Sequence, residues 1–170
     1  TMTSVFFFFF IAICFWYADQ YSILFLALPI GLFVRMALNA LDGMMARVYN
    51  QQSKKGEILN ELGDVISDIA LFFPLLKFES QAIYAVVVFI CLSIINEFGG
   101  ILAKVVSGDR RYDGPMGKSD RAFMIGLYGL LSFLGVHTSS YSIYIFAALI
   151  LLLILSTFTR LKKSLLIIKK

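Results

Sequence analysis

Apolar runs long enough to cross a bilayer recur along this chain, and they constrain its fold more than any other feature. A helix needs about 20 predominantly apolar residues to cross a hydrocarbon core of ~30 Å. We predict six such spans, at residues 4–18, 22–47, 57–76, 82–106, 119–136 and 141–160. With 59% hydrophobic residues and a mean hydropathy of +0.84, the chain is too apolar for an ordinary soluble domain. The sequence therefore predicts an all-α integral membrane protein, with six transmembrane helices in a single domain over residues 1–170.

The distribution of positive charge predicts the orientation of these spans. Most of the 15 Lys and Arg residues lie at or beyond the ends of spans two, four and six, whereas the opposite connections contain only Lys77. Because Lys and Arg are retained in cytoplasmic loops, we predict that both termini face the cytoplasm, in a bacterial inner membrane. The net charge of +4 suits an anionic lipid surface, and the sequence contains no nucleic-acid-binding motif.

Polar residues interrupt spans two and three at a regular spacing. The string Asn39-x-x-Asp42-Gly43-x-x-Ala46-Arg47 is followed, after eight residues, by Gly56-x-x-x-Asn60-x-x-x-Asp64. These intervals place the polar residues on one face of each helix. Carboxylates and carboxamides are costly in lipid and mark functional sites, and oxygens converging from two helices suit hard divalent cations and their phosphate ligands. We therefore predict a metal and nucleotide site at the cytoplasmic ends of helices two and three.

This string resembles the signature of the CDP-alcohol phosphatidyltransferases, which is Asp-x-x-Asp-Gly-x-x-Ala-Arg, eight residues, then Gly-x-x-x-Asp-x-x-x-Asp. Every spacing matches over 26 residues, but two of the four aspartates are replaced here by Asn39 and Asn60. The resemblance implies a homodimeric enzyme of phospholipid biosynthesis that depends on Mg²⁺ or Mn²⁺. Its reaction would transfer a phosphatidyl group from CDP-diacylglycerol to a small polar alcohol and release CMP. Family members usually carry an amphipathic segment before their first span, so we expect this chain to be part of a longer protein.

The resemblance also implies roles for individual residues. The metal-ligand positions are Asn39, Asp42, Asn60 and Asp64. Asp64 matches the aspartate thought to deprotonate the acceptor hydroxyl, and Arg47 matches the arginine that meets the donor phosphate. The CDP-lipid is expected against Asp42, Gly43, Ala46, Arg47 and Gly56. Gly43 and Ala46 would serve helix–helix packing equally well, but the flanking carboxylates favour ligand contact.

The two asparagines leave three explanations open. Four aspartates would give the site a formal charge of −4, whereas Asp42 and Asp64 alone give −2. The protein either works with one tightly held ion or recruits a second ion with the nucleotide. Alternatively, Asp68, Glu57 or Glu61 supplies the missing charge, although acids near a helix start also offset its dipole. In the third explanation, the asparagines silence catalysis.

Several other polar residues have two readings each. Arg35 forms an ion pair with Glu97 or lies at the base of the polar cavity. Lys118 and Arg121, at the start of span five, would contact the acceptor phosphate or lipid headgroups. Cys14 and Cys91 are interpreted as packing residues.

Two other functions compete with the phosphatidyltransferase reading. One is a catalytically silent family member that binds CDP-lipid or metal. The other is a small cation transporter, but the lack of internal repeats counts against it.

Overall fold

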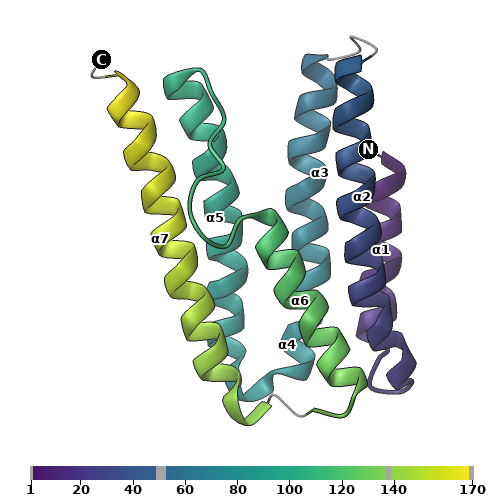
Figure 1. Ribbon diagram of the computed structural model, residues 1–170. Coiled ribbons are helices and arrows are strands. Elements are labelled where there is room, and N and C mark those ends of the chain that lie inside the picture. Colours follow the sequence, from purple (N-terminus) through teal and green to yellow (C-terminus); the bar gives the residue numbers. More distant parts are fainter. Residues whose placement is uncertain (1, 49–52, 137–138, 169–170) are drawn as a thin grey trace. The chain divides into compact units, whose positions relative to one another are not determined.

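Helices account for nearly all of the secondary structure in the computed structural model, which describes residues 2–48, 53–136 and 139–168 (Figure 1). The long helices are α1 (Met2–Trp16), α2 (Ala27–Val48), α3 (Lys54–Phe72), α5 (Ile83–Ser107), α6 (Lys118–Phe133) and α7 (Ser142–Ile168). Short helical turns are η1 (Ser22–Leu26), α4 (Leu75–Phe78), η2 (Ser80–Ala82) and η3 (Ser139–Tyr141). These described residues form no strand, which confirms the all-α class.

Two helical stretches among the described residues are long and apolar enough to cross a membrane. They are Ser80–Ser107 and Ser139–Ile167, and shorter apolar helices occur at Val5–Trp16 and Ser22–Leu38. All six predicted spans fall on helices, but the six-span topology stays a prediction. The difference has a physical cause in α3, where the charged and amide side chains that form the motif lower the average hydropathy.

The chain forms two compact units. The first consists of Thr1–Lys77 and Ala122–His137, and the second consists of Phe78–Arg121 and Thr138–Lys170. Helix α6 therefore begins in the second unit and continues in the first.

In the first unit, α1 packs against both α2 and α3 (Figure 1). Phe15 of α1 is fully buried, and its ring lies 6.1 Å from the rings of Phe25 and Tyr128. Gly129 of α6 permits a close approach, because a Cβ atom there would lie 2.8 Å from the carbonyl oxygen of Phe25. Aromatic and aliphatic side chains from α1, η1, α2 and α6 thus form one core.

In the second unit, α5 and α7 lie side by side. Phe89 and Phe146 join them in an edge-on ring contact with centroids 5.6 Å apart. Gly108 ends α5 with a positive φ of 84°, and the following loop runs back along α5 to the start of α6 (Figure 1). Gly114 of this loop has φ +94°, and a Cβ atom there would lie 2.7 Å from Cα of Ser156 in α7. A glycine at this position therefore lets the loop pack directly against α7.

Candidate active site

The polar motif lies on the last three turns of α2 and the first three turns of α3. Helix α2 carries Asn39, Asp42, Gly43, Ala46 and Arg47, whose side chains lie outside the described residues. The described part of the candidate site is therefore its α3 half, together with Arg35 from the middle of α2.

A side-chain cap fixes the start of α3. Ser53 is extended, and its Oγ accepts a hydrogen bond of 3.0 Å from the backbone N–H of Gly56. Such N-caps satisfy one of the free N–H groups of the first turn and typically contribute about 1 kcal/mol. A Cβ atom at Gly56 would lie 3.0 Å from the same Oγ. The motif glycine is thus exposed and closely fitted to the cap, an arrangement that suits approach of a ligand to the backbone.

Three oxygen-bearing side chains follow along α3, one helical turn apart. Asn60 and Asp64 are half-buried, and Asp68 lies one turn further and is buried. Arg35 of α2 reaches this row with its guanidinium, which is only 2% exposed. Its Nη1 lies 2.5 Å from Oδ1 of Asp68, and its Nη2 lies 3.7 Å from Oδ1 of Asp64.

Further contacts hold the Arg35 side chain in place. Its Nη2 donates a 3.3 Å hydrogen bond to the backbone carbonyl of Asp64, and its guanidinium lies 5.0 Å from the ring centroid of Phe8. The predicted Arg35–Glu97 ion pair is wrong, because Arg35 pairs with carboxylates of α3. The alternative, that Arg35 lies at the base of the polar cavity, stays a prediction; the structure shows Arg35 beside Asp64.

The chemistry of the α3 donors fits a hard divalent cation in part. The carboxylate of Asp64 and the amide oxygen of Asn60 are suitable ligands. Asp68 fits less well, because its negative charge is already offset by Arg35. Glu57 is exposed and Glu61 half-buried on the same helix. The described residues contain no group of three or more His, Cys, Asp or Glu side chains placed to hold a metal; the motif side chains of α2 lie outside them.

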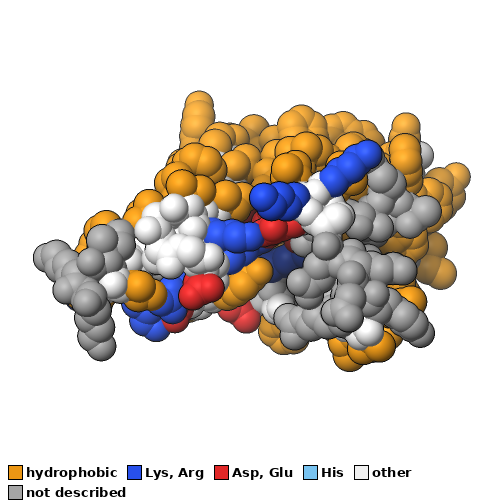
Figure 2. Space-filling view, turned by 90° about the horizontal axis from the view of Figure 1, so that it is seen from above, with side chains coloured by type: hydrophobic (Ala, Val, Ile, Leu, Met, Phe, Trp, Pro, Cys, Tyr) orange, Lys and Arg blue, Asp and Glu red, His pale blue; other side chains and the backbone are white. Residues whose placement is uncertain are grey.

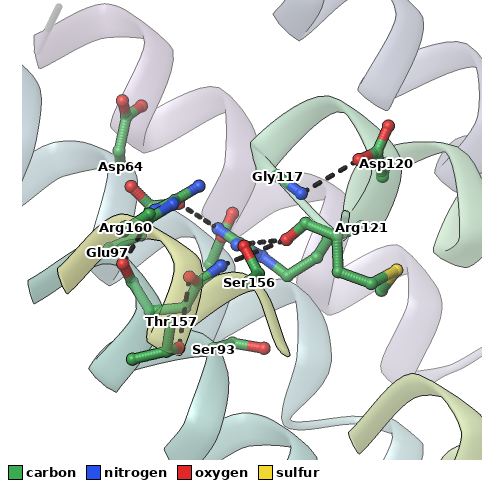
Figure 3. Close-up of polar contacts among 12 residues, drawn as sticks. Asp64, Ser93, Glu97, Gly117, Asp120, Arg121, Ser156, Thr157 and Arg160 are labelled. Atoms are coloured by element: carbon green, nitrogen blue, oxygen red, sulfur yellow. Dashed lines mark hydrogen bonds and ion pairs between the residues drawn. The ribbon is translucent and has the colours of Figure 1, made fainter. Parts of the chain in front are cut away.

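A second polar cluster lies inside the second unit and is centred on Glu97 of α5 (Figure 3). Oε1 of Glu97 pairs with Arg121 at 2.7 Å, and Oε2 pairs with Arg110 at 2.6 Å. Arg160 of α7 approaches the same carboxylate at 4.0 Å. Glu97, Arg121 and Arg160 are each less than 5% exposed. One buried carboxylate thus faces three guanidinium groups.

Backbone acceptors satisfy much of this buried positive charge. Arg160 donates to the carbonyls of Asn96 (2.7 Å) and Asp113 (3.2 Å). The side chain of Asn96 donates to the carbonyl of Met116 at 3.2 Å and accepts from Thr157 at 3.3 Å. The cluster therefore fastens the loop between α5 and α6 onto α5 and α7.

The two residues predicted to contact the acceptor phosphate or lipid headgroups, Lys118 and Arg121, lie in the first turn of α6. Arg121 is fully buried, pairs with Glu97 and donates to the carbonyl of Met116, so its guanidinium already has partners inside the second unit, and its phosphate contact stays a prediction. Lys118 starts α6 and is half-exposed. The cluster around Arg110 and Arg160 was missed because positive charge at helix ends is also explained by topology. The available signal was Glu97, an acid within an apolar run that needs cationic partners.

Charged side chains also gather over the end of α5 and α7 that carries this loop (Figure 2). Lys163 of α7 pairs with Asp113 at 2.5 Å, and Arg111 approaches Asp113 at 3.6 Å. The hydrogen bond from Lys163 lowers the pKa of Asp113 below its ordinary value of 3.8. Asp113 is therefore ionised at neutral pH, and its contact with Lys163 gives the loop a further attachment to α7.

Comparison with known proteins decides the family. The sequence model of the CDP-alcohol phosphatidyltransferases matches residues 1–159. This chain belongs to the CDP-alcohol phosphatidyltransferase family. Members of this family are typically phosphatidyltransferases of phospholipid synthesis, bind CDP-alcohol substrates and membrane lipids, and generally depend on a divalent cation.

A curated relative also matches. Inner membrane protein YnbA of Escherichia coli (strain K12) is 60% identical over 109 residues, which are 64% of this chain and 54% of YnbA. The chain thus spans about half the length of this relative. No solved structure matches the chain.

Proposed function

We propose that this protein transfers a phosphatidyl group from CDP-diacylglycerol to the hydroxyl of a small polar alcohol and releases CMP. The observation that carries the proposal is the position of Asp64, one turn from Asn60 on α3 and 3.7 Å from the buried guanidinium of Arg35. Asp64 stands at the last aspartate of the family signature, and the family match covers most of the chain.

The proposed reaction is a displacement at the β-phosphorus of CDP-diacylglycerol. The acceptor oxygen forms a bond to this phosphorus, and the bond from the phosphorus to the bridging pyrophosphate oxygen breaks. CMP leaves with that oxygen and its electron pair, while the hydroxyl proton passes to the carboxylate of Asp64. Arg35 positions Asp64, because it holds both its backbone carbonyl and its carboxylate. Arg47 and the small-residue strip at Gly43 and Ala46 are proposed to receive the donor.

Asp42, Asp64, Asn39 and Asn60 are the proposed ligands of Mg²⁺ or Mn²⁺. When bound, the cation would neutralise negative charge on the pyrophosphate as CMP leaves. The positive charge of Arg35 offsets the negative charge of Asp68. We therefore propose that Asn60 and Asp64 supply the ligand oxygens on α3, whereas Asp68 forms the ion pair with Arg35.

A second function is favoured by Asn39 and Asn60. Two carboxamides in place of carboxylates reduce the formal charge of the four ligand positions from −4 to −2, which weakens attraction for divalent ions. On this alternative, the protein binds CDP-lipid or metal without turnover.

The name of the relative supports a proposed location in a bacterial inner membrane. The Lys and Arg distribution supports cytoplasmic termini and an active site open to the cytoplasm. A homodimer is proposed from the family resemblance alone.

One assay separates the two functions. The purified protein is incubated with CDP-diacylglycerol, Mg²⁺ and a panel of small alcohols, and CMP release and lipid products are measured. We expect CMP release with at least one acceptor and its loss in Asp64→Asn. As a control, Asp109→Asn alters an exposed loop carboxylate and should leave the rate unchanged. Saturable binding of CDP-diacylglycerol without CMP release from any acceptor would support the silent form instead.

A further inference from the structure

An apolar groove of about 390 Å³ lies on the first unit between α1 and α3. Its walls include Phe9, Ile13 and Trp16 from α1, Ile66 and Ala70 from α3, and Phe73, which caps the end of α3. It is larger than the ~150 Å³ apolar cavity that takes up benzene in an engineered protein. Phe9, Ile13 and Phe73 are 45%, 56% and 53% exposed, so much apolar surface is available here for an occupant.

A charged pair stands at one end of this groove. Lys77 pairs with Asp19 at 2.7 Å and donates a 2.8 Å hydrogen bond to the carbonyl of Trp16. The ammonium of Lys77 lies 5.3 Å from the centroid of the Trp16 ring, which stacks on Phe73 at 6.2 Å. The side chains of Lys77 and Asp19 are 30% and 43% exposed, so a ligand can reach both charges.

Asp19 is negatively charged at neutral pH. The hydrogen bond from Lys77 lowers the pKa of this carboxyl below its ordinary value of 3.8. The end of the groove therefore presents one positive and one negative group side by side, next to an indole ring. Tryptophan is enriched where a protein passes from the hydrocarbon region of a membrane to the headgroups.

This combination matches one class of ligand. An apolar groove accepts an acyl chain, and adjacent opposite charges complement a headgroup that itself carries a phosphate and an ammonium. We propose that the groove holds an acyl chain of a zwitterionic phospholipid, with its phosphate at Lys77 and its ammonium at Asp19. An anionic phospholipid fits less well, because its headgroup offers no cation to Asp19.

The proposed lipid site is separate from the candidate active site. The groove contacts α3 at Ile66, Ile69 and Ala70 and the C-cap residue Phe73, all beyond Asn60 and Asp64 along the chain. Binding of a phospholipid in this groove requires no turnover of CDP-diacylglycerol. The lipid site can therefore be tested independently of the proposed enzymatic function.

The protein carries its own probe of this site, since Trp16 is its single tryptophan. In detergent micelles, Trp16 fluorescence is titrated with phosphatidylethanolamine whose acyl chains are brominated, because bromine quenches indole on contact. We expect saturable quenching that unbrominated phosphatidylethanolamine competes away. Brominated phosphatidylglycerol should need a several-fold higher mole fraction to reach the same quenching.

Two pairs of variants sharpen the test. Ala70→Leu fills the groove and should weaken quenching several-fold, whereas Ala85→Leu enlarges a comparably half-buried alanine of α5 outside it and should have no effect. Lys77→Gln should abolish the preference between headgroups, whereas Lys55→Gln, an exposed lysine of α3, should preserve it.

Two results would overturn the proposal. Quenching that rises linearly with the mole fraction of either lipid, unchanged by Ala70→Leu, would mean that Trp16 merely faces bulk lipid. Trp16 protected from all brominated lipids at high protein concentration, and quenched only on dilution, would mean that a second copy of the chain covers the groove.

Discussion

Arg35 and Asp68 form a buried ion pair between α2 and α3, with Nη1 and Oδ1 2.5 Å apart and side chains only 2% and 8% exposed. The pair lies one turn beyond Asp64, whose carbonyl oxygen accepts a hydrogen bond from the same guanidinium. The geometry of the candidate active site therefore depends on a charge balance between two helices. Removing either charge should disturb both the stability of the fold and the position of Asp64.

We predict that Arg35→Met destabilises the protein by about 3–5 kcal/mol, because it leaves Asp68 buried without its cation. The free energy of unfolding is measured by denaturant titration in micelles. The double variant Arg35→Met/Asp68→Leu should lose less than the sum of the single variants, since it removes the buried Asp68 carboxylate together with its cation. Lys55→Gln, on an exposed side chain of α3, should change stability by less than about 0.5 kcal/mol. If the losses of unfolding free energy in the Arg35 and Asp68 single variants simply added up in the double variant, the ion pair between these residues would be contradicted.

Restoring aspartate at positions 39 and 60 should tighten divalent binding. Two unit charges 4 Å apart interact by about 4 kcal/mol near a protein surface, so we expect at least about tenfold tighter Mn²⁺ binding by titration calorimetry. Gln81→Glu adds an exposed acid elsewhere and should not produce this change. If the present protein is silent, the double variant should also begin to release CMP. Equal Mn²⁺ affinity in the present protein and in the double variant would show that Asn39 and Asn60 are not metal ligands.

Replacing Glu97 should release the loop between α5 and α6. Glu97→Gln removes the carboxylate that pairs with Arg110 and Arg121, so we expect hydrogen exchange of residues 109–117 to accelerate at least about tenfold. Gly114→Ala should have a similar effect through its positive φ and its contact with Ser156. Asp109→Asn is the matched control within the loop. Unchanged exchange in both loop-directed variants would show that other contacts fix the loop.

The six-span topology can be tested by labelling a single cysteine. In a Cys14→Ala/Cys91→Ala background, Ser139→Cys should react only with a reagent added to the periplasmic side of a bacterial inner membrane. Lys55→Cys, exposed in the first turn of α3, is the reciprocal control and should react only from the cytoplasm. Labelling of both cysteines from one side would rule out the predicted orientation.

The positions of the helices could be predicted because apolar runs and turn residues are local signals. The choice of ionic partners could not. From the sequence, Arg35 could pair with Glu97 or lie at the base of the polar cavity, and its observed partners, Asp64 and Asp68, are selected by tertiary packing. Arg110 and Arg160 lie where positive-inside topology also places cations, so the one sequence signal for their burial was Glu97, an acid within an apolar run. The motif spacing, in contrast, predicts that Gly56, Asn60 and Asp64 share one helix, and all three lie on α3.

The shared carboxylate of Glu97 has a consequence for how the chain is made. Synthesis proceeds from the N-terminus, so Glu97 exists before all of its cations. Arg110 follows 13 residues later and Arg121 follows 24 residues later. Arg160 belongs to the last helix and arrives only when that helix has been made. An isolated charge in lipid is costly, so α5 gains its full neutralisation in stages. Nascent chains arrested before Arg110 leaves the ribosome should therefore hold α5 at the insertion machinery, whereas chains arrested after Arg121 has emerged should release it into the bilayer.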